Sequence, residues 1–393
     1  MTSYNFDEMI ERFGTGSEKY DLCDEMFGTT DLLPMWVADM DFRTPDFIVD
    51  AVTHRMKDPI FGYTLREEAF FTAVAQWMER RHGWKIKEEW VTFSPGVVSA
   101  LSIAILALTQ PGDKIVVQSP VYPPFYASVE GNDRTLVKNP LAIKEGRYHM
   151  DLEHLKSVID EKTRMIMISN PHNPGGTVWT PEELKALGEI CIEYDLILIS
   201  DEIHSDLVND GFVHTPAASL SEELSLRTVT CVSSSKTFNA AGLATSGVII
   251  ADEAMRKLYD KRLNAIHVGF GNIFGNPALV AAYTQGDAWL DELKAYVGKN
   301  LRYAMEQITT HIPEITPMNP EASYLLWMDC SGLGLSQEEL RTFMVKEAGL
   351  GLNDGESYGE EGVGFMRINL ACPFSVVEKA MERLKRAVEK LRA

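Results

Sequence analysis

One stretch of the sequence limits the kind of sheet that the chain can form. The apolar run 164–169 is followed by a helical pattern that opens at Thr180-Pro181-Glu182-Glu183, and then by a second apolar run, 196–200. Thr180 and Glu183 have the spacing of a capping box, and proline suits the first position of a helix. A strand, a helix and a strand with short connections form a βαβ unit. We therefore expect two parallel strands in an α/β sheet.

Polar residues follow three successive strands of this expected sheet. Asn173 follows the run 164–169, Asp201 follows the run 196–200, and Lys236 follows the apolar run 228–232 and three serines. Successive parallel strands usually lie side by side, and ligands gather at their carboxyl ends, so these side chains are expected to converge. An amine can condense with an aldehyde, a carboxylate can keep a pyridine nitrogen protonated, and an amide can donate to a phenolate oxygen. Together they suit pyridoxal phosphate.

Two further segments are candidates for holding such a cofactor. Gly96 precedes a helix expected over 100–108, and free amides at a helix N-terminus bind anions such as phosphate. Tyr122 lies in the proline-rich loop 119–126, where the prolines restrict the backbone and hold its ring rigidly. Each residue alone also fits an ordinary role, as a helix cap for Gly96 and as a packed aromatic side chain for Tyr122.

The pattern of the sequence changes beyond Gly286. A long amphipathic helix is expected over 289–308, and strands at 324–328 and 365–370 alternate with helices over 337–348 and 376–391. At 393 residues, the chain exceeds what one hydrophobic core usually organises. We therefore predict a large, mostly parallel α/β domain over residues 48–285. Residues 1–47, as an N-terminal arm, and 286–393 are predicted to form a smaller α+β domain.

Charge and cysteine usage argue against several classes of protein. The net charge is −20, and no run of Lys or Arg offers a surface for nucleic acid. The five cysteines form no C-x-x-C pair and no ligand spacing with histidine, so buried free thiols and no metal site are expected. No apolar stretch is long enough to span a bilayer, and the N-terminal residues lack the pattern of a signal peptide. We expect a cytoplasmic protein that binds neither nucleic acid nor membrane.

The segments around these polar residues resemble a known family. Fold-type I pyridoxal-phosphate enzymes of the class I/II aminotransferase superfamily have, in the same order and spacing, the equivalents of Asn170-Pro171-His172-Asn173-Pro174-Gly175-Gly176, Asp201-Glu202-Ile203-His204 and Ser233-Ser234-Ser235-Lys236. The resemblance covers nearly the whole chain, from Trp36-Val37-Ala38-Asp39-Met40-Asp41-Phe42 to Met366-Arg367-Ile368-Asn369. It implies the α/β fold of the pyridoxal-phosphate-dependent transferases.

The resemblance also implies a role for each matching residue toward the cofactor. Lys236 forms the Schiff base and later moves the Cα proton of the substrate. Asp201 pairs with the pyridinium nitrogen, and Asn173 pairs with the phenolate oxygen. Tyr122 stacks on the ring, and the catalytic residues are Lys236 and Tyr122. The residues implied to hold the phosphate are Gly96, Val97, Ser233 and Ser235.

Substrate and subunit contacts follow from the same resemblance. Arg367 matches the arginine that grips the substrate carboxylate in a bidentate fork, and Trp36 and Asn173 are expected beside it. Tyr63 matches the tyrosine that reaches the phosphate of the neighbouring subunit. A homodimer with shared active sites is therefore implied.

Two positions depart from the typical aminotransferase. Ala244 stands where many of these enzymes carry a phosphate-binding arginine, and His204 stands where many have tyrosine. Both departures resemble the MalY/PatB branch of cystathionine β-lyases and related C–S lyases. His204 is expected near the cofactor, where it either tunes the environment of the ring or orients Asp201.

The resemblance to this branch predicts an α,β-elimination. L-Cystathionine or a related S-substituted cysteine, an amino-acid thioether, is expected to give a thiol, pyruvate and ammonia. An aminotransferase acting on amino acids and a catalytically idle regulatory protein that binds the cofactor are the alternatives. The sequence leaves open which S-substituted cysteine is preferred.

Overall fold

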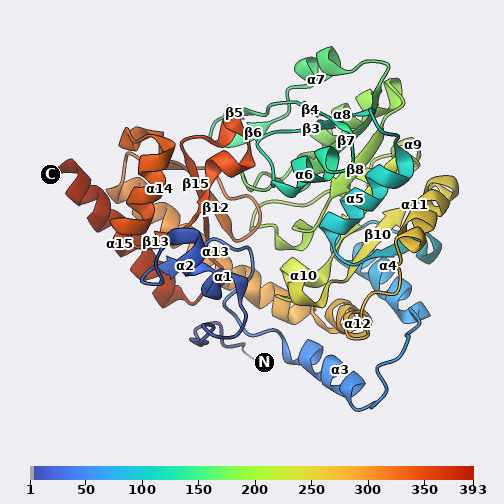
Figure 1. Ribbon diagram of the computed structural model, residues 1–393, viewed down its shortest axis with the longest axis horizontal. Coiled ribbons are helices and arrows are strands. Elements are labelled where there is room, and N and C mark those ends of the chain that lie inside the picture. Colours follow the sequence, from blue (N-terminus) through green and yellow to red (C-terminus); the bar gives the residue numbers. More distant parts are fainter. Residues whose placement is uncertain (1–3) are drawn as a thin grey trace.

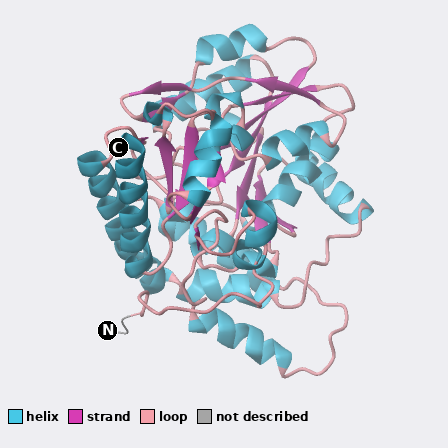
Figure 2. Cartoon of the chain, turned by 60° about the vertical axis from the view of Figure 1, so that its left-hand side comes forward, coloured by secondary structure: helices cyan, strands magenta, loops and turns pink. Residues whose placement is uncertain are grey.

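A seven-stranded sheet with helices on both sides forms the centre of the computed structural model, which describes residues 4–393 (Figures 1 and 2). The pairs β9–β8, β8–β7, β7–β3 and β3–β4 are parallel, whereas β10 is antiparallel to both β9 and β2. The expected mostly parallel α/β sheet is therefore confirmed. In spatial order, the strands are β2 (Val91–Ser94), β10 (Ser246–Ile250), β9 (Thr228–Val232), β8 (Ile197–Asp201), β7 (Thr163–Ser169), β3 (Lys114–Val117) and β4 (Thr135–Lys138).

The central strands are mostly apolar and buried because both faces of the sheet are covered. Every residue of β9 is buried, and so are the last five residues of β7. The register pairs Asp201 with Ser169 on one side and with Cys231 on the other, which aligns the carboxyl ends of the three strands. The strands expected at 164–169, 196–200 and 228–232 are confirmed to within one residue, and they are neighbours in the sheet.

The helices that cover the sheet begin where local signals place them. In α8, Thr180 Oγ1 accepts from Glu183 N at 3.2 Å and Glu183 Oε2 accepts from Thr180 N at 2.9 Å, which confirms the capping box. The helix expected from residue 100 begins at Val97, directly after Gly96. The helices are α1 (Glu18–Asp21), α2 (Cys23–Phe27), α3 (Asp46–Met56), α4 (Glu68–His82), α5 (Val97–Leu108), α6 (Pro124–Glu130), α7 (Leu152–Val158), α8 (Pro181–Glu193), α9 (Glu222–Ser225), α10 (Ser234–Thr237), α11 (Glu253–Ala265), α12 (Gly275–Gln285), α13 (Asp287–His311), α14 (Gln337–Lys346) and α15 (Phe374–Arg392).

A second, antiparallel sheet lies in the C-terminal part of the chain. Its order is β11 (Thr316–Pro317), β12 (Leu325–Asp329), β15 (Phe365–Asn369) and β14 (Asn353–Asp354). The N-terminal segment reaches this part, because β1 (Leu33–Pro34) pairs in parallel with β13 (Leu350–Gly351). A separate hairpin is formed by β5 (Ala142–Lys144) and β6 (Arg147–His149). The domain limits at 47/48 and 285/286 stay a prediction, and the two main sheets fall on either side of the second limit.

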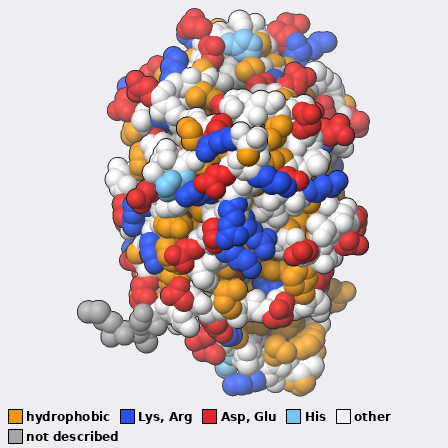
Figure 3. All heavy atoms as spheres, turned by 90° about the vertical axis from the view of Figure 1, so that its left-hand side faces the viewer, with side chains coloured by type: hydrophobic (Ala, Val, Ile, Leu, Met, Phe, Trp, Pro, Cys, Tyr) orange, Lys and Arg blue, Asp and Glu red, His pale blue; other side chains and the backbone are white. Residues whose placement is uncertain are grey.

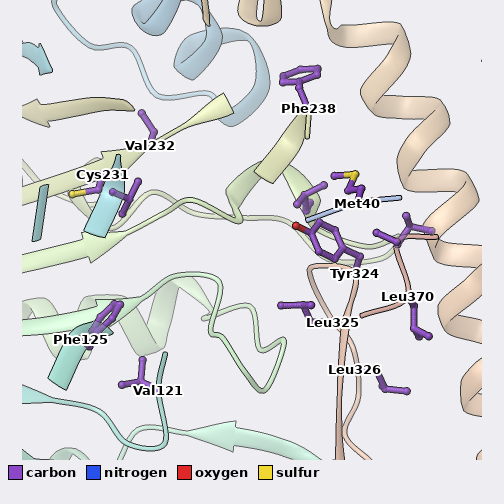
Figure 4. Close-up of a cluster of buried hydrophobic side chains, with 14 of the residues drawn as sticks. Met40, Val121, Phe125, Cys231, Val232, Phe238, Tyr324, Leu325, Leu326 and Leu370 are labelled. Atoms are coloured by element: carbon purple, nitrogen blue, oxygen red, sulfur yellow. The ribbon is translucent and has the colours of Figure 1, made fainter. Parts of the chain in front are cut away.

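One hydrophobic core joins the two sheets and the N-terminal segment. Met40 from that segment, Val121 and Phe125 after β3, Phe238 after α10 and Tyr324 before β12 all belong to the same buried cluster (Figure 4). The short helix that carries Lys236 is therefore packed against parts of the chain that are distant in sequence.

The surface carries charges of both signs. Figure 3 shows acidic and basic side chains interspersed over the face that includes the C-terminal helices. Between residues 4 and 393, no helix is long and apolar enough to cross a membrane, and no group of three His, Cys, Asp or Glu side chains is arranged to hold a metal ion. All five cysteines are free and buried, as expected.

Two glycines in and before α13 provide a test of this packing. A Cβ at Gly286 would lie 2.3 Å from the ring of Phe238 and 2.4 Å from Ala282 O, so we expect Gly286→Ala to lower the free energy of unfolding by about 1–3 kcal/mol. At Gly298, a Cβ would meet only the flexible end of Arg302, so Gly298→Ala should raise it by about 0.5–1 kcal/mol. Urea unfolding of the two variants measures both effects. Equal effects from the two substitutions would contradict the packing described for Phe238.

Candidate active site

A cavity of about 210 Å³ lies at the carboxyl ends of the central strands, beside the N-terminus of α5. The structure brings eight of the predicted site residues to its wall. They are Gly96, Val97, Tyr122, Asn173, Asp201, His204, Ser235 and Lys236. The predicted convergence of residues from three successive strand ends is thus found in the structure, whereas the chemical role of each residue stays a prediction.

Lys236 projects from α10, a single helical turn that begins directly after β9. Ser233 caps this turn, because its Oγ accepts from Ser235 N at 3.2 Å. Lys236 Nζ donates to the backbone carbonyl of Ala38 at 2.7 Å. Burial, reinforced by the positive charge of Arg367, lowers the pKa of Lys236 from 10.5 to about 8. The amine therefore loses its proton far more readily than an ordinary lysine.

Asp201 ends β8 and is buried on the floor of the cavity. Its Oδ1 accepts from Ile203 N at 3.1 Å. Burial is the main reason that the pKa of Asp201 is raised to about 7, and the neighbouring carboxylate of Glu202 adds to the effect. A carboxylate with so few hydrogen-bond partners would be stabilised in its charged form by a cationic N–H donor in the cavity.

Arg367 connects the second sheet to the cavity. It lies on β15 and is 2% exposed. Its Nη1 donates to Asn173 Oδ1 and its Nη2 donates to the carbonyl of Trp36, both at 3.0 Å, while Nε is buried and has no partner among residues 4–393. A buried donor without a partner is costly, and an acceptor such as a carboxylate would satisfy it. Asn173, whose Oδ1 is occupied, has its amide nitrogen free to donate.

The N-terminus of α5 forms a cradle on another wall of the cavity. Gly96 has φ 122°, a conformation that favours glycine, and a Cβ there would project into open space. The free amides of the first turn of α5 suit an anion. Ser235 lines the cavity, whereas Ser233 is 3% exposed, does not line it, and lies 3.0 Å from both Thr245 O and Ser235 Oγ. In the structure, Ser233 therefore stabilises the turn that presents Ser235.

His204 lies beside Lys236 in the cavity wall. Burial, together with the nearby positive charges of Lys236 and Arg367, lowers its pKa to about 3, so the ring is neutral at neutral pH. Its Nδ1 is 3.3 Å from Ser323 Oγ. Within residues 4–393 it makes no hydrogen bond to Asp201, so the environment of the ring, rather than the orientation of Asp201, is the role that this arrangement favours.

Besides Ser233 and Arg367, which contact the wall through Ser235 and Asn173, two further predicted site residues, Trp36 and Tyr63, lie outside the cavity wall. The indole of Trp36 packs edge-on against Phe27 at 5.7 Å and donates to Lys19 O at 2.9 Å, so only its carbonyl approaches the site, through Arg367. Tyr63 is 97% exposed on the loop between α3 and α4. It does not reach the cavity of its own chain.

Ala38 and Tyr324 are site residues that the sequence analysis did not identify. The carbonyl of Ala38 accepts from Lys236 Nζ and, at 2.9 Å, from Tyr324 Oη. Asn369 holds this segment in place by donating to the carbonyls on either side, those of Val37 and Asp39. The segment was recognised as a motif, but a backbone acceptor has no signature in residue types.

The chemical groups around the cavity fit pyridoxal phosphate. The anion cradle at Gly96, the buried carboxylate of Asp201, the free amide of Asn173 and the low-pKa amine of Lys236 match its phosphate, ring nitrogen, phenolate and aldehyde. Ala244, at φ 44°, is exposed and not part of the wall, so no cation comes from that position. The fold and this site define a fold-type I pyridoxal-phosphate enzyme.

Comparison with known proteins identifies the family. The family model described as aminotransferase class I and II matches residues 30–384. The cystathionine β-lyase PatB of Bacillus subtilis is 47% identical over 98% of this chain and 100% of its own length, and the protein MalY of Escherichia coli is 31% identical over 99% and 100%. The pyridoxal-phosphate-bound C–S lyase from Staphylococcus hominis superposes with a TM-score of 0.90, at 34% identity over 98% of each chain. The chain belongs to the class I and II aminotransferase family, in its branch of PatB/MalY-type cystathionine β-lyases.

The neutral state of His204 predicts a pH-dependent contribution to stability. Between pH 6.5 and about 3, only the unfolded chain takes up this proton, so acid favours unfolding. The variant His204→Gln lacks this effect. As the pH falls from neutral to about 5, we expect the wild type to lose stability relative to the variant, by at most about 1.4 kcal/mol per pH unit. Urea unfolding of the cofactor-free proteins measures the difference, and a constant difference would contradict the lowered pKa.

Proposed function

We propose that the protein cleaves the C–S bond of L-cystathionine or a related S-substituted cysteine by α,β-elimination. The observation that carries this proposal is the placement of Lys236, Asp201 and Asn173 around one cavity, with Arg367 hydrogen-bonded to Asn173 in its wall. The family branch supports a C–S lyase, and the aminotransferase and idle regulatory alternatives are not favoured. Elimination would release a thiol, pyruvate and ammonia.

Pyridoxal phosphate, when bound, supplies the aldehyde that captures the substrate amine and a protonated ring that accepts the electron pair left at Cα. Lys236 would hold it covalently, Asp201 at the ring nitrogen, and Asn173 at the phenolate oxygen. Tyr122 would cover the ring. The phosphate would be held by the backbone of Gly96 and Val97 and by Ser235, and Ser233 would support Ser235.

Arg367 would bind and orient the substrate. Its unpartnered Nε points to a carboxylate as the missing acceptor, and Asn173 Oδ1 keeps the guanidinium in place. Fixing the α-carboxylate in this way limits how the substrate Cα can face the lysine. Trp36 contributes a carbonyl that holds Arg367 rather than a side chain that touches the substrate.

Lys236 would then move the Cα proton. A proton acceptor must be neutral, and a pKa of about 8 instead of 10.5 increases the neutral fraction at neutral pH by about two orders of magnitude. The carbonyl of Ala38 accepts from the amine when the amine is not bonded to the cofactor. His204, neutral beside it, adds no positive charge that would repel a protonated lysine.

The release of products from cystathionine tests the function directly. We expect the purified protein with pyridoxal phosphate to form pyruvate, ammonia and homocysteine without any added keto acid. Lys236→Ala should abolish this turnover and the absorbance of the lysine-bound cofactor near roughly 420 nm, because the amine forms that bond. Amino transfer to 2-oxoglutarate in place of pyruvate release would sink the lyase proposal. A panel of other S-substituted cysteines then ranks the substrates.

A homodimer with shared sites is the second part of the proposal. Tyr63 and its neighbours expose large apolar side chains: Ile60 is 72%, Phe61 61%, Leu65 84% and Phe270 58% exposed. The rings of Tyr63 and Phe270 are 5.8 Å apart, and exposed apolar side chains that gather in this way are typical of an interface. Tyr63 would reach the phosphate site of the partner subunit.

A cytoplasmic location is proposed as well, in keeping with five free thiols.

Mixed dimers test whether the sites are shared. Tyr63→Ala and Lys236→Ala each damage both sites of a homodimer, but a dimer with one subunit of each kind contains one intact site. After unfolding and refolding of an equal mixture, we expect about a quarter of the wild-type activity. Each variant refolded alone is the control. Activity of the mixture equal to the mean of the two controls would show that Tyr63 serves its own subunit or no site.

A further inference from the structure

One buried carboxylate near the active site takes no part in the proposed chemistry. Asp206 lies in the turn after β8, with a side chain that is 3% exposed. Its Oδ1 accepts from Trp77 Nε1 at 2.9 Å and lies 2.8 Å from His82 Nε2. Its Oδ2 accepts from Thr237 Oγ1 at 2.7 Å. Three donors from two helices thus meet at one carboxylate.

Two of these donors belong to a long, well-packed helix. Trp77 and His82 are both on α4, and the Trp77 ring stacks on Tyr283 of α12 with centroids 4.8 Å apart. The Trp77 ring also meets Phe238, the residue after α10, at 5.8 Å. Asp206 is therefore hydrogen-bonded to a helix none of whose residues lines the cavity.

The third donor belongs to the helix that carries the lysine. Thr237 directly follows Lys236 on α10, is completely buried, and does not line the cavity. A helix of four residues does not hold its own shape, because helix formation needs several turns to become favourable. The position of the lysine therefore depends on what the ends and sides of α10 contact.

The hydrogen bond between Lys236 and Ala38 cannot hold the lysine in place during the reaction. Its amine donates to the carbonyl of Ala38, and this hydrogen bond has to be given up whenever the amine acts elsewhere. The contact between Thr237 and Asp206 does not involve the amine and can persist throughout. It is thus a tether of α10 that is independent of the state of the lysine.

We propose that Asp206 is a positioning residue for Lys236. Through the hydroxyl of Thr237, it holds the backbone of α10 against α4, so that the lysine amine stays aimed into the cavity when it leaves the Ala38 carbonyl. The proposal rests on the proposed function of Lys236 as proton carrier. A displacement of about 1 Å at a reacting group lowers rates by about a hundredfold, so loss of this tether should be visible in turnover.

Removal of the Thr237 hydroxyl tests the tether. We expect Thr237→Val to lower kcat for cystathionine by about tenfold or more with little change in KM, since Arg367 is untouched. Thr237→Ser, which keeps the hydroxyl, should retain most of the rate. The matched control is Thr228→Val, at the other end of β9, where an equally buried threonine hydroxyl donates to Leu224 O at 2.6 Å. This variant should lose stability without losing kcat.

A second readout does not depend on turnover. Cofactor-free protein takes up pyridoxal phosphate by bond formation at Lys236, which the growth of the visible absorbance follows. We expect Thr237→Val and Asp206→Asn to slow this uptake, whereas Thr237→Ser and Thr228→Val take it up at the wild-type rate. If the wild type releases no pyruvate, the lyase function fails, but the uptake rates still decide on the tether.

Several results would overturn the proposal. They are an unchanged kcat and uptake rate in Thr237→Val, a loss in Thr237→Ser as large as in Thr237→Val, or an equal loss in Thr228→Val. If Thr237→Val does not fold, Thr237→Ala removes the hydroxyl without adding a methyl group in its place, and the same expectations apply to it.

Discussion

The hydrogen bonds of Arg367 join the three parts of the molecule on which the site depends. The guanidinium belongs to the second sheet, and it donates to Asn173 after β7 and to the Trp36 carbonyl of the N-terminal segment. A buried cation needs such partners, because one left uncompensated costs several kcal/mol. Together with the shared hydrophobic core, the hydrogen bonds of this buried charge therefore hold the segment, the large sheet and the second sheet in place at the cavity.

Much of the large sheet could be predicted because its central strands are buried on both faces. The strands at 228–232 and 164–169 are mostly apolar and almost entirely buried, and a capping box marks the start of α8. The edge strand β2 and the helices α11 and α12 were missed. β2 has only four residues, two of them polar, and α12 combines Gly275 and Pro277 with small apolar residues that give little helical period. The structure of β2 and α12 therefore depends on packing against the rest of the chain, whereas α11 has a local start signal in its cap Asp252.

The site was predictable where chemistry and strand ends coincide, and unpredictable where it depends on the backbone. Asn173, Asp201 and Lys236 follow buried strands, so the topology alone brings them together. Nothing in the sequence shows that the acceptor for the lysine is the carbonyl of Ala38, or that the indole of Trp36 turns toward Phe27. The role of Asp206 could not be predicted either, because its three donors come from residues up to 129 positions away in the sequence.

The use of a backbone carbonyl as the partner of the free Lys236 amine has a consequence for inheritance. A carboxylate partner could be deleted by a single codon change, whereas every residue type at position 38 supplies the same oxygen. The contact can be lost only if the whole segment shifts, and Asn369 restrains that shift through two neighbouring carbonyls. Which residue types position 38 accepts is thus limited only by the space available for a side chain. Asn369 is the residue whose side chain keeps this contact in place.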